Sequence, residues 1–359
     1  MYLPENQMRE HRHDSSAASG ATFLPFRLRP SHVPAPVSSP SEFAFELALC
    51  AHLEQTTDWL PARQLGASVA SPGSRIIDVC AVVPGPGFDE RARITDRAIP
   101  AAAIESDVGA GSAVFWRDGF DCHPGRARRA TDRAVEVGFF ESERRRSREY
   151  VRRAARYPDD WFARLVGIEN KPDLGTPGDL LRQLRLDVSL AVFDEVILTT
   201  ESYVTGAHLN RIPEEVGVWR FDPDTGDREV VREARPLSPH STGVEPVEYH
   251  SLHTDVALVS PAEKRTARLR LAERAYGKGW RAYDLPGCAH ARADADGRPV
   301  CAHFDRVVDP GSECGADCSA FEAADPPELD RDGLRESRTG WVADPPGAVR
   351  RQSGLDRYF

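Results

Sequence analysis

The chain has almost no lysine: of its 46 basic residues, only Lys171, Lys264 and Lys278 are lysine. It also lacks any run of 18 apolar residues, so no segment is expected to span a membrane. The first 41 residues lack the apolar stretch of a signal peptide. They are polar and rich in proline and serine, so we expect a disordered extension over residues 1–40 and a cytoplasmic protein.

The charge balance is acidic, with 56 acids against 46 bases and a net charge of −10. Acidic charge with arginine replacing lysine almost everywhere indicates a salt-adapted organism with GC-rich DNA. That coding bias explains most of the arginines. It also makes each remaining lysine more informative, because a compact ammonium is not interchangeable with a guanidinium.

The hydrophobic pattern predicts a core of helices and strands. At 359 residues the chain can form one large core with an appendage, or two modest domains. Strands are expected at 75–83, 163–171, 195–202 and 216–221, and helices at 41–55, 178–190 and 261–276. Residues 222–286 are expected to connect this core to the C-terminal part. The tail over 322–359 is rich in Pro, Asp and Gly, so we expect it to be disordered.

Carboxylates and a lysine interrupt these apolar strands. Asp78 lies in the first strand, while Glu169 and Lys171 are two positions apart in the second, so their side chains should share a face. A buried carboxylate is costly unless it is paired or binds a metal. Two carboxylates that meet favour Mg²⁺ or Mn²⁺, and a neighbouring lysine can stabilise charge on a phosphate. The sequence therefore predicts a metal site at these three residues.

The stretches RIIDV at 75–79 and GIENK at 167–171 resemble the two signature strands of the PD-(D/E)XK nucleases. The resemblance covers residues 41–221 and implies an α/β, restriction-endonuclease-like core: a helix, a mixed central sheet and a helix. It implies that Asp78 and Glu169 ligate Mg²⁺ or Mn²⁺ and that Lys171 positions the attacking water. Two further residues would lie near the metal, Glu46 of the first helix and Gln183 of the helix after the second signature.

Two features depart from the nuclease pattern. Ile77 stands where a proline often precedes the acidic residue, and residues 84–160 must form an insertion between the signature strands. Within the insertion, a helix, a turn and strand-like residues resemble the end of a winged helix. Between Arg117 and Arg156 there are twelve arginines against seven acids, a surplus of five positive charges. Such a patch on an acidic chain is typical of a nucleic-acid footprint.

Four arginines of this insertion are candidates for contact with a DNA backbone: Arg144, Arg145, Arg146 and Arg148. The alternative is a solvated face in which nearby acids pair with the arginines. The candidate acids are Glu136, Glu141, Glu143 and Glu149.

Four of the seven cysteines lie within 31 positions, in a segment expected to be a metal module over 287–321. They are Cys288, Cys301, Cys314 and Cys318, with 12, 12 and 3 residues between them. A local cluster of this kind favours metal over disulfides where no secretory signal is present. Four thiolates suit Zn²⁺ or a [4Fe–4S] cluster. Because the set is self-contained, zinc is slightly favoured. The other three cysteines are expected to be reduced core thiols.

The chain as a whole also resembles an uncharacterised haloarchaeal family, a domain of unknown function. Our leading hypothesis is a Mg²⁺-dependent DNA phosphodiesterase. Two rivals remain open. One is a non-catalytic DNA-binding or regulatory protein with a degenerate nuclease fold and structural zinc, and the other is a partner-binding protein with a zinc knuckle.

Overall fold

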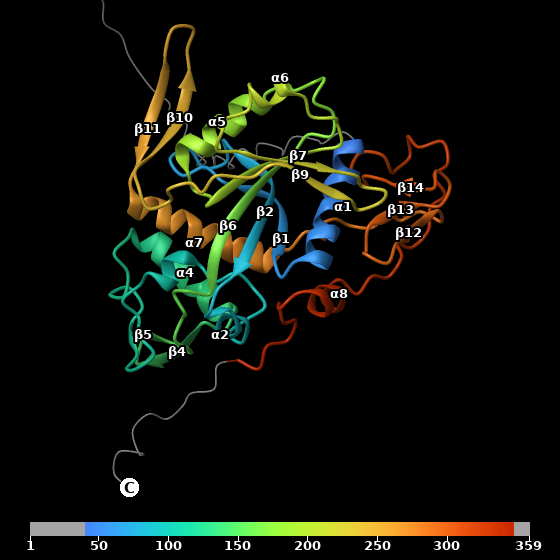
Figure 1. The fold of residues 1–359 in the computed structure, drawn as a ribbon. Coiled ribbons are helices and arrows are strands. Elements are labelled where there is room, and N and C mark those ends of the chain that lie inside the picture. Colours follow the sequence, from blue (N-terminus) through green and yellow to red (C-terminus); the bar gives the residue numbers. More distant parts are fainter. Residues whose placement is uncertain (1–39, 348–359) are drawn as a thin grey trace, which may run out of the picture. The chain divides into compact units, whose positions relative to one another are not determined.

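A mixed sheet of six strands forms the centre of the protein (Figure 1). The computed structural model describes residues 40–347. Residues 1–39 of the extension expected over 1–40 and the end of the tail therefore lie outside the described residues, while Pro40 begins a helix. In spatial order the strands are β1 (Leu60–Gly66), β2 (Ile76–Pro84), β6 (Phe162–Asn170), β7 (Glu195–Thr200), β8 (Gly217–Phe221) and β9 (Arg228–Arg232). The β6–β7 and β7–β8 pairs are parallel, and the other pairs are antiparallel.

Helices cover both faces of this sheet. On β2, Val79 packs in one core with the apolar side chains of α1 (Pro40–Thr56), while its neighbour Cys80 packs in the other. The second core includes residues of α5 (Leu180–Leu190) and α7 (Pro261–Lys278). Alternation along buried strands produces this division, because successive side chains point to opposite faces. The expected mixed α/β fold is confirmed, and the predicted helices and strands lie within a few residues of those observed.

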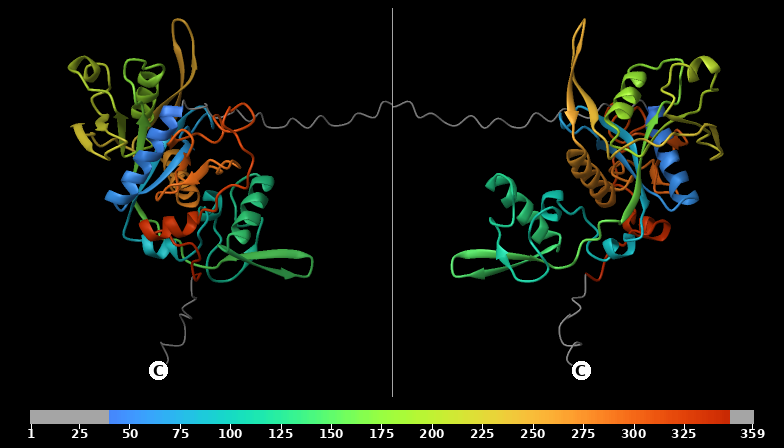
Figure 2. Two further views of the ribbon diagram at one scale, coloured as in Figure 1. Left: turned by 90° about the vertical axis from the view of Figure 1, so that its right-hand side faces the viewer. Right: turned by 60° about the vertical axis from the view of Figure 1, so that its left-hand side comes forward.

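The segment between β2 and β6 forms a unit of its own helices and strands. Its elements are α2 (Phe88–Ala92), α3 (Ala101–Ile104), β3 (Val114–Phe115), α4 (Pro124–Glu136), β4 (Phe140–Arg145) and β5 (Arg148–Arg153). The last three strands form a small sheet in the order β3-β5-β4. The segment that we expected to form a turn between helix and strand is thus itself part of the β4–β5 hairpin, which extends outward in Figure 2.

One of the remaining elements lies between β7 and β8, and the others follow β9. They are α6 (Gly206–Leu209), the β10–β11 hairpin (Gly243–Tyr249 and Thr254–Val259), the three short strands β12 (Ala291–Ala293), β13 (Pro299–Cys301) and β14 (Arg306–Val307), and α8 (Arg331–Arg338). The structure differs from the disorder expected over 322–347, because α8 forms there. The side chain of Asp330 caps this helix by accepting from the backbone N of Gly333 (2.8 Å). No helix among the described residues is long and apolar enough to cross a bilayer.

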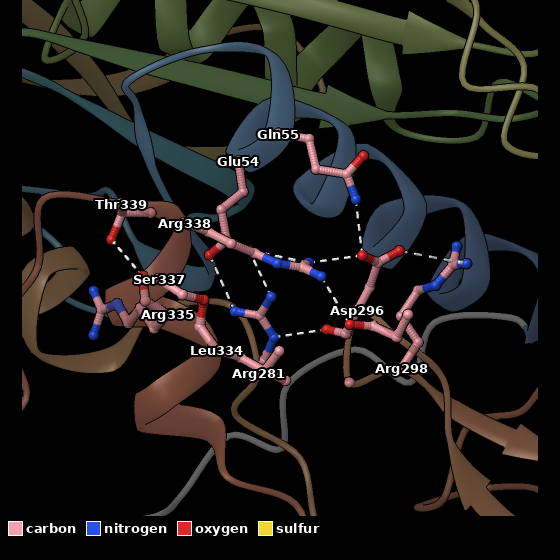
Figure 3. A network of polar contacts seen from close by, with 12 residues as sticks. Glu54, Gln55, Arg281, Asp296, Arg298, Leu334, Arg335, Ser337, Arg338 and Thr339 are labelled. Carbon is pink, nitrogen blue, oxygen red and sulfur yellow. Dashed lines mark hydrogen bonds and ion pairs between the residues drawn. The ribbon is translucent and has the colours of Figure 1, made fainter.

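A buried polar network fixes the C-terminal segments to α1 (Figure 3). Arg281 donates to both carboxylate oxygens of Glu54, which is 3% exposed. Arg338 of α8 donates to Asp296 (2.7 Å), and Asp296 also accepts from Gln55 of α1 (2.8 Å). A buried carboxylate needs such partners. Polar contacts far apart in sequence thus attach α8 and the cysteine-bearing segment to the first helix.

Candidate metal centres and nucleic-acid surface

Asp78 lies where β1, β2 and β6 meet. Its Oδ2 accepts a hydrogen bond from the backbone N of Asn170 on β6 (2.9 Å), and its Oδ1 accepts from Nε2 of Gln64 on β1 (3.3 Å). The carboxylate is half-buried. Because the two signature strands are antiparallel neighbours, with Val79 opposite Ile168, Asp78 lies beside the segment that carries Glu169.

Glu169 is 3% exposed and forms an ion pair with Arg75. Arg75 also donates from Nε and Nη2 to the two carboxylate oxygens of Asp187 on α5 (3.0 and 2.6 Å). A planar guanidinium suits this two-pronged geometry. One buried cation therefore holds two buried carboxylates. Neither Arg75 nor Asp187 was predicted from the sequence, although an arginine before a buried strand and an acid among the leucines of α5 are both visible signals.

Glu46 approaches the same region from α1. It is 2% exposed, forms an ion pair with Arg63 and accepts from Nε2 of Gln64 (3.1 Å). Gln64 therefore links Glu46 to Asp78. Its backbone φ is +52°, a strained value for a residue with a side chain. Lys278 holds the backbone here, since its Nζ donates to the carbonyl oxygens of Arg63 and Gln64 (2.6 and 3.0 Å).

The strand that carries Gln64 was not predicted from the sequence either. β1 has the sequence LPARQLG, in which proline, arginine and glutamine break any apolar alternation. Arg63 is nevertheless buried, because Glu46 pairs with it. The burial of this strand therefore depends on a tertiary contact, which the local sequence does not reveal.

Lys171 has a different partner from Glu169. It follows the last residue of β6, and its Nζ forms an ion pair with Oε1 of Glu42 on α1 (2.6 Å). Glu169 instead contacts Arg75, which directly precedes β2. The two side chains that were expected to share a face therefore form separate ion pairs. Gln183 is half-buried on α5, one helical turn before Asp187 and on the same face as that residue.

The electrostatics of the region are those of a buried acidic cluster. Burial raises the pKa of Asp78, and burial followed by the negative charge of Asp78 raises the pKa of Glu169 well above its ordinary value. Burial also raises the pKa of Glu46 from 4.5 to about 7. If all are ionised, four carboxylates face two guanidiniums: Glu46, Asp78, Glu169 and Asp187 against Arg63 and Arg75.

The surplus of two negative charges matches one divalent cation, and carboxylate oxygens suit Mg²⁺ or Mn²⁺. A second observation points the same way. Asn170 is 7% exposed, and both polar atoms of its side chain lack a hydrogen-bond partner. Buried polar groups without partners are rare and call for a water molecule or an ion. The residues present therefore fit a hard divalent cation.

The four clustered cysteines line one pocket of about 330 Å³. Burial raises the pKa of Cys314 to about 11, and the neighbouring thiols Cys301, Cys318 and Cys288 add to the shift. The rings of His290 and His303 lie 5.4 Å apart nearby. Among the described residues, however, a tighter group of potential metal ligands lies elsewhere. It consists of His250, His253 and Asp255, whose ligand atoms are all within 4.8 Å of one another.

The four candidate DNA-binding arginines lie at the end of the β4–β5 hairpin and are exposed. Arg145 and Arg148 are directly opposite each other, and Arg146 in the turn has a φ of +59°. Like charges directly opposite destabilise a hairpin, so an anion bound there would relieve the repulsion. The acids of the alternative model do form ion pairs, with Arg133, Arg152, Arg145 and Arg128 respectively for Glu136, Glu141, Glu143 and Glu149.

The chain belongs to a family of unknown function, DUF5787, whose model matches residues 60–323. The expectation of an uncharacterised domain family is thereby confirmed. No curated protein and no solved structure matches the chain. The matched range begins at β1 and ends next to the bridge between Cys288 and Ala323, so it includes Asp78, Glu169 and all four clustered cysteines.

Proposed function

We propose that the protein is a Mg²⁺-dependent DNA phosphodiesterase with the metal held by Asp78 and Glu169. The observation that supports this most is the position of Asp78, which is hydrogen-bonded to the residue next to Glu169 on the neighbouring strand. Apart from β1 and the insertion, the order α1–β2–β6–α5–β7 agrees with the helix, strand, strand, helix and strand that the resemblance to PD-(D/E)XK nucleases implies. The insertion then lies between the two signature strands, as that resemblance requires.

Each residue of the cluster has a distinct role in this proposal. Asp78 and Glu169 would hold the cation, which when bound would supply an activated water and neutralise charge on the phosphate. Arg75 orients Glu169 and Asp187 through paired hydrogen bonds. Lys171, now paired with Glu42, donates to the phosphate when the substrate binds. Glu46, with a pKa of about 7, exchanges a proton near neutral pH.

The β4–β5 hairpin supplies the contact with DNA. The four exposed arginines would bind phosphates, which fixes the orientation of the duplex without specifying its sequence. A small sheet in the order β3-β5-β4 beside α4 supports the resemblance to a winged helix, in which such a hairpin lies along the backbone.

The alternative is a DNA-binding protein without catalysis, and one observation favours it. Arg75 forms an ion pair with Glu169, so a guanidinium competes for the carboxylate that would hold the metal. A degenerate nuclease fold would retain this pair as a structural replacement for the cation. We further propose that the four clustered cysteines bind Zn²⁺ as a structural site.

Cleavage assays with Mn²⁺ on single- and double-stranded DNA separate these functions. We expect Asp78→Ala and Lys171→Ala to lower the cleavage rate by about a hundredfold or more. Glu328→Gln, which changes an exposed acid of the C-terminal segment, should leave the rate unchanged. Cleavage that survives both active-site substitutions contradicts the proposed site. DNA binding by the wild type without any cleavage supports the non-catalytic alternative.

A further inference from the structure

The end of the β10–β11 hairpin carries two histidines and two carboxylates on one face. Glu248 lies directly opposite Asp255, and the backbone N of His250 donates to the carbonyl oxygen of His253 (2.9 Å). Side chains two positions apart on a strand share a face. His250 therefore lies on the same face as Glu248, and His253 on the same face as Asp255.

The ligand atoms of this group are already close together. Nε2 of His250 is 3.1 Å from Oδ2 of Asp255, and Nε2 of His253 is 3.6 Å from Oδ1 of the same carboxylate. Oε2 of Glu248 lies 3.9 Å from Nε2 of His250. Two ligand atoms on a tetrahedral zinc ion are roughly 3.3 Å apart, given Zn–N and Zn–O distances of about 2.0–2.1 Å. The observed separations are near that value before any rearrangement.

The electrostatics of the face favour a cation. Glu248 and Asp255 are like charges on directly opposed positions, an arrangement that destabilises a hairpin. The rings of His250 and His253 stack with their centroids 4.3 Å apart, so the two imidazoles face the same space. A divalent cation between these groups would remove the repulsion of the carboxylates and coordinate the imidazole nitrogens.

The hairpin is anchored at its base, and its turn is exposed. Near the base, the fully buried Glu245 accepts hydrogen bonds from the backbone N of Val69 and of Ala70 (2.9 and 2.7 Å). At the other end, the side chains of His253 and Asp255 are 65% and 60% exposed. Figures 1 and 2 show the hairpin extending away from the central sheet. The backbone thus presents a preformed set of ligands whose remaining coordination positions face solvent.

We propose that His250, His253 and Asp255 form a binding site for a divalent transition-metal ion, with Zn²⁺ the natural occupant and Glu248 in reach as a fourth ligand. Two imidazoles and a carboxylate favour Zn²⁺, Ni²⁺ or Cu²⁺ over Mg²⁺. The site is separate from the acidic cluster and from the cysteines, and it does not depend on the proposed nuclease activity.

Calorimetric titration of the untagged full chain with Zn²⁺ tests the site. Excess Mg²⁺ is present to occupy the proposed acidic site, and one equivalent of Zn²⁺ is added first to fill the proposed thiolate site, because four thiolates would bind Zn²⁺ more tightly than this site. We then expect one further binding event in the wild type. Because His253→Ala and His250→Ala each remove a ligand, each should weaken that event at least tenfold. Asp255→Asn, which weakens an oxygen ligand, should also reduce the affinity.

His240→Ala is the matched control, since His240 is an exposed histidine outside the hairpin. It should bind the further Zn²⁺ as tightly as the wild type. The proposal is overturned if the wild type shows no event beyond the thiolate site, which would mean that the histidines only form ion pairs with Asp255. It is also overturned if His253→Ala binds as tightly as His240→Ala. Circular dichroism of each variant checks that the fold is retained.

Discussion

Each of the three lysines holds a contact for which a compact ammonium is suited. Lys264 is fully buried, and its Nζ donates to the carbonyl oxygens of Leu190 and Ser238 (3.1 Å each). Lys278 donates to the backbone of β1 next to the strained Gln64, and Lys171 forms an ion pair with Glu42. A rotating ammonium can point its donors at separate carbonyl groups, whereas a guanidinium has a fixed fork. The scarcity of lysine thus marked structurally demanding positions.

Glu46 gives a prediction at the scale of a single residue. Its pKa rises from 4.5 to about 7 in the folded protein, chiefly because burial disfavours the charged form. Between these values the folded state binds more protons than the unfolded chain, so the free energy of unfolding falls as pH rises through this window. Glutamine cannot ionise. We therefore expect Glu46→Gln to gain roughly 2 kcal/mol relative to the wild type between pH 5 and pH 8.

Urea unfolding of both proteins across this pH range measures the difference. Glu328→Gln removes an exposed carboxylate and should follow the wild type at every pH. A free-energy difference between Glu46→Gln and the wild type that stays constant from pH 5 to pH 8 would show that Glu46 ionises in the folded protein as it does in the unfolded chain.

At the scale of elements, two hairpins place side chains of like charge directly opposite each other on their paired strands. The β4–β5 hairpin places Arg145 opposite Arg148 and gives Arg146 a positive φ. The β10–β11 hairpin places Glu248 opposite Asp255. Both arrangements cost stability in isolation. They are of opposite sign, which suits phosphate in the first hairpin and a metal cation in the second.

The arginine hairpin gives a prediction for DNA binding. Replacing all four arginines, at 144, 145, 146 and 148, by alanine should weaken binding at low salt and reduce the slope of log K against log salt by about 3 to 4. The slope falls because binding releases about one counterion fewer for each phosphate contact that is lost. Fluorescence anisotropy with a labelled duplex at several salt concentrations measures both quantities.

A matched control changes four exposed arginines elsewhere, Arg97, Arg164, Arg235 and Arg292. This control keeps the net charge of the hairpin variant, so any effect of overall charge appears in both proteins. Equal slopes for the two variants would mean that the hairpin is not the phosphate-binding surface.

At the scale of the whole molecule, α1 is enclosed on two sides. One side packs on the sheet, and the other carries Glu54 and Gln55, whose partners Arg281 and Asp296 come from the C-terminal part of the chain. This explains why nearly every described side chain from Phe43 to Leu53 is buried. The cysteine-bearing segment and α8 therefore stabilise the helix that supplies Glu46.

Removal of metal from the cysteines gives a prediction at this scale. If Zn²⁺ orders the segment, a strong chelator should lower the thermal midpoint and speed amide exchange in residues 287–338 and in α1. The amides of β2 and β6 should keep their protection, because their hydrogen bonds lie in the central sheet. Hydrogen-exchange mass spectrometry measures both regions. Cys50→Ser, outside the cluster, should contain as much Zn²⁺ as the wild type, whereas Cys301→Ser should contain one Zn²⁺ fewer per chain. Equal zinc content in these two variants, or unchanged exchange after chelation, would contradict the structural role.

The sequence by itself determined the elements whose order and spacing are local. Apolar β-branched runs predicted β2, β6 and β7, and caps and periodicity predicted α1, α5 and α7. Asp78, Glu169 and Glu46 were identifiable because a carboxylate within an apolar pattern needs a partner. Those signals depend on neighbours within a few residues, so they can be recognised in the sequence without knowledge of the fold.

Only the tertiary structure decided who those partners are. Gln64, Arg75 and Asp187 come from a strand without apolar alternation, a turn and a helix, and nothing local indicates that they meet. The same holds for Lys171, which engages Glu42 of α1, and for the described tail, where Arg338 orders α8 by binding Asp296. A buried charged side chain needs a partner because burial removes it from water. Which residue becomes that partner depends on which segments the sheet and its helices bring together.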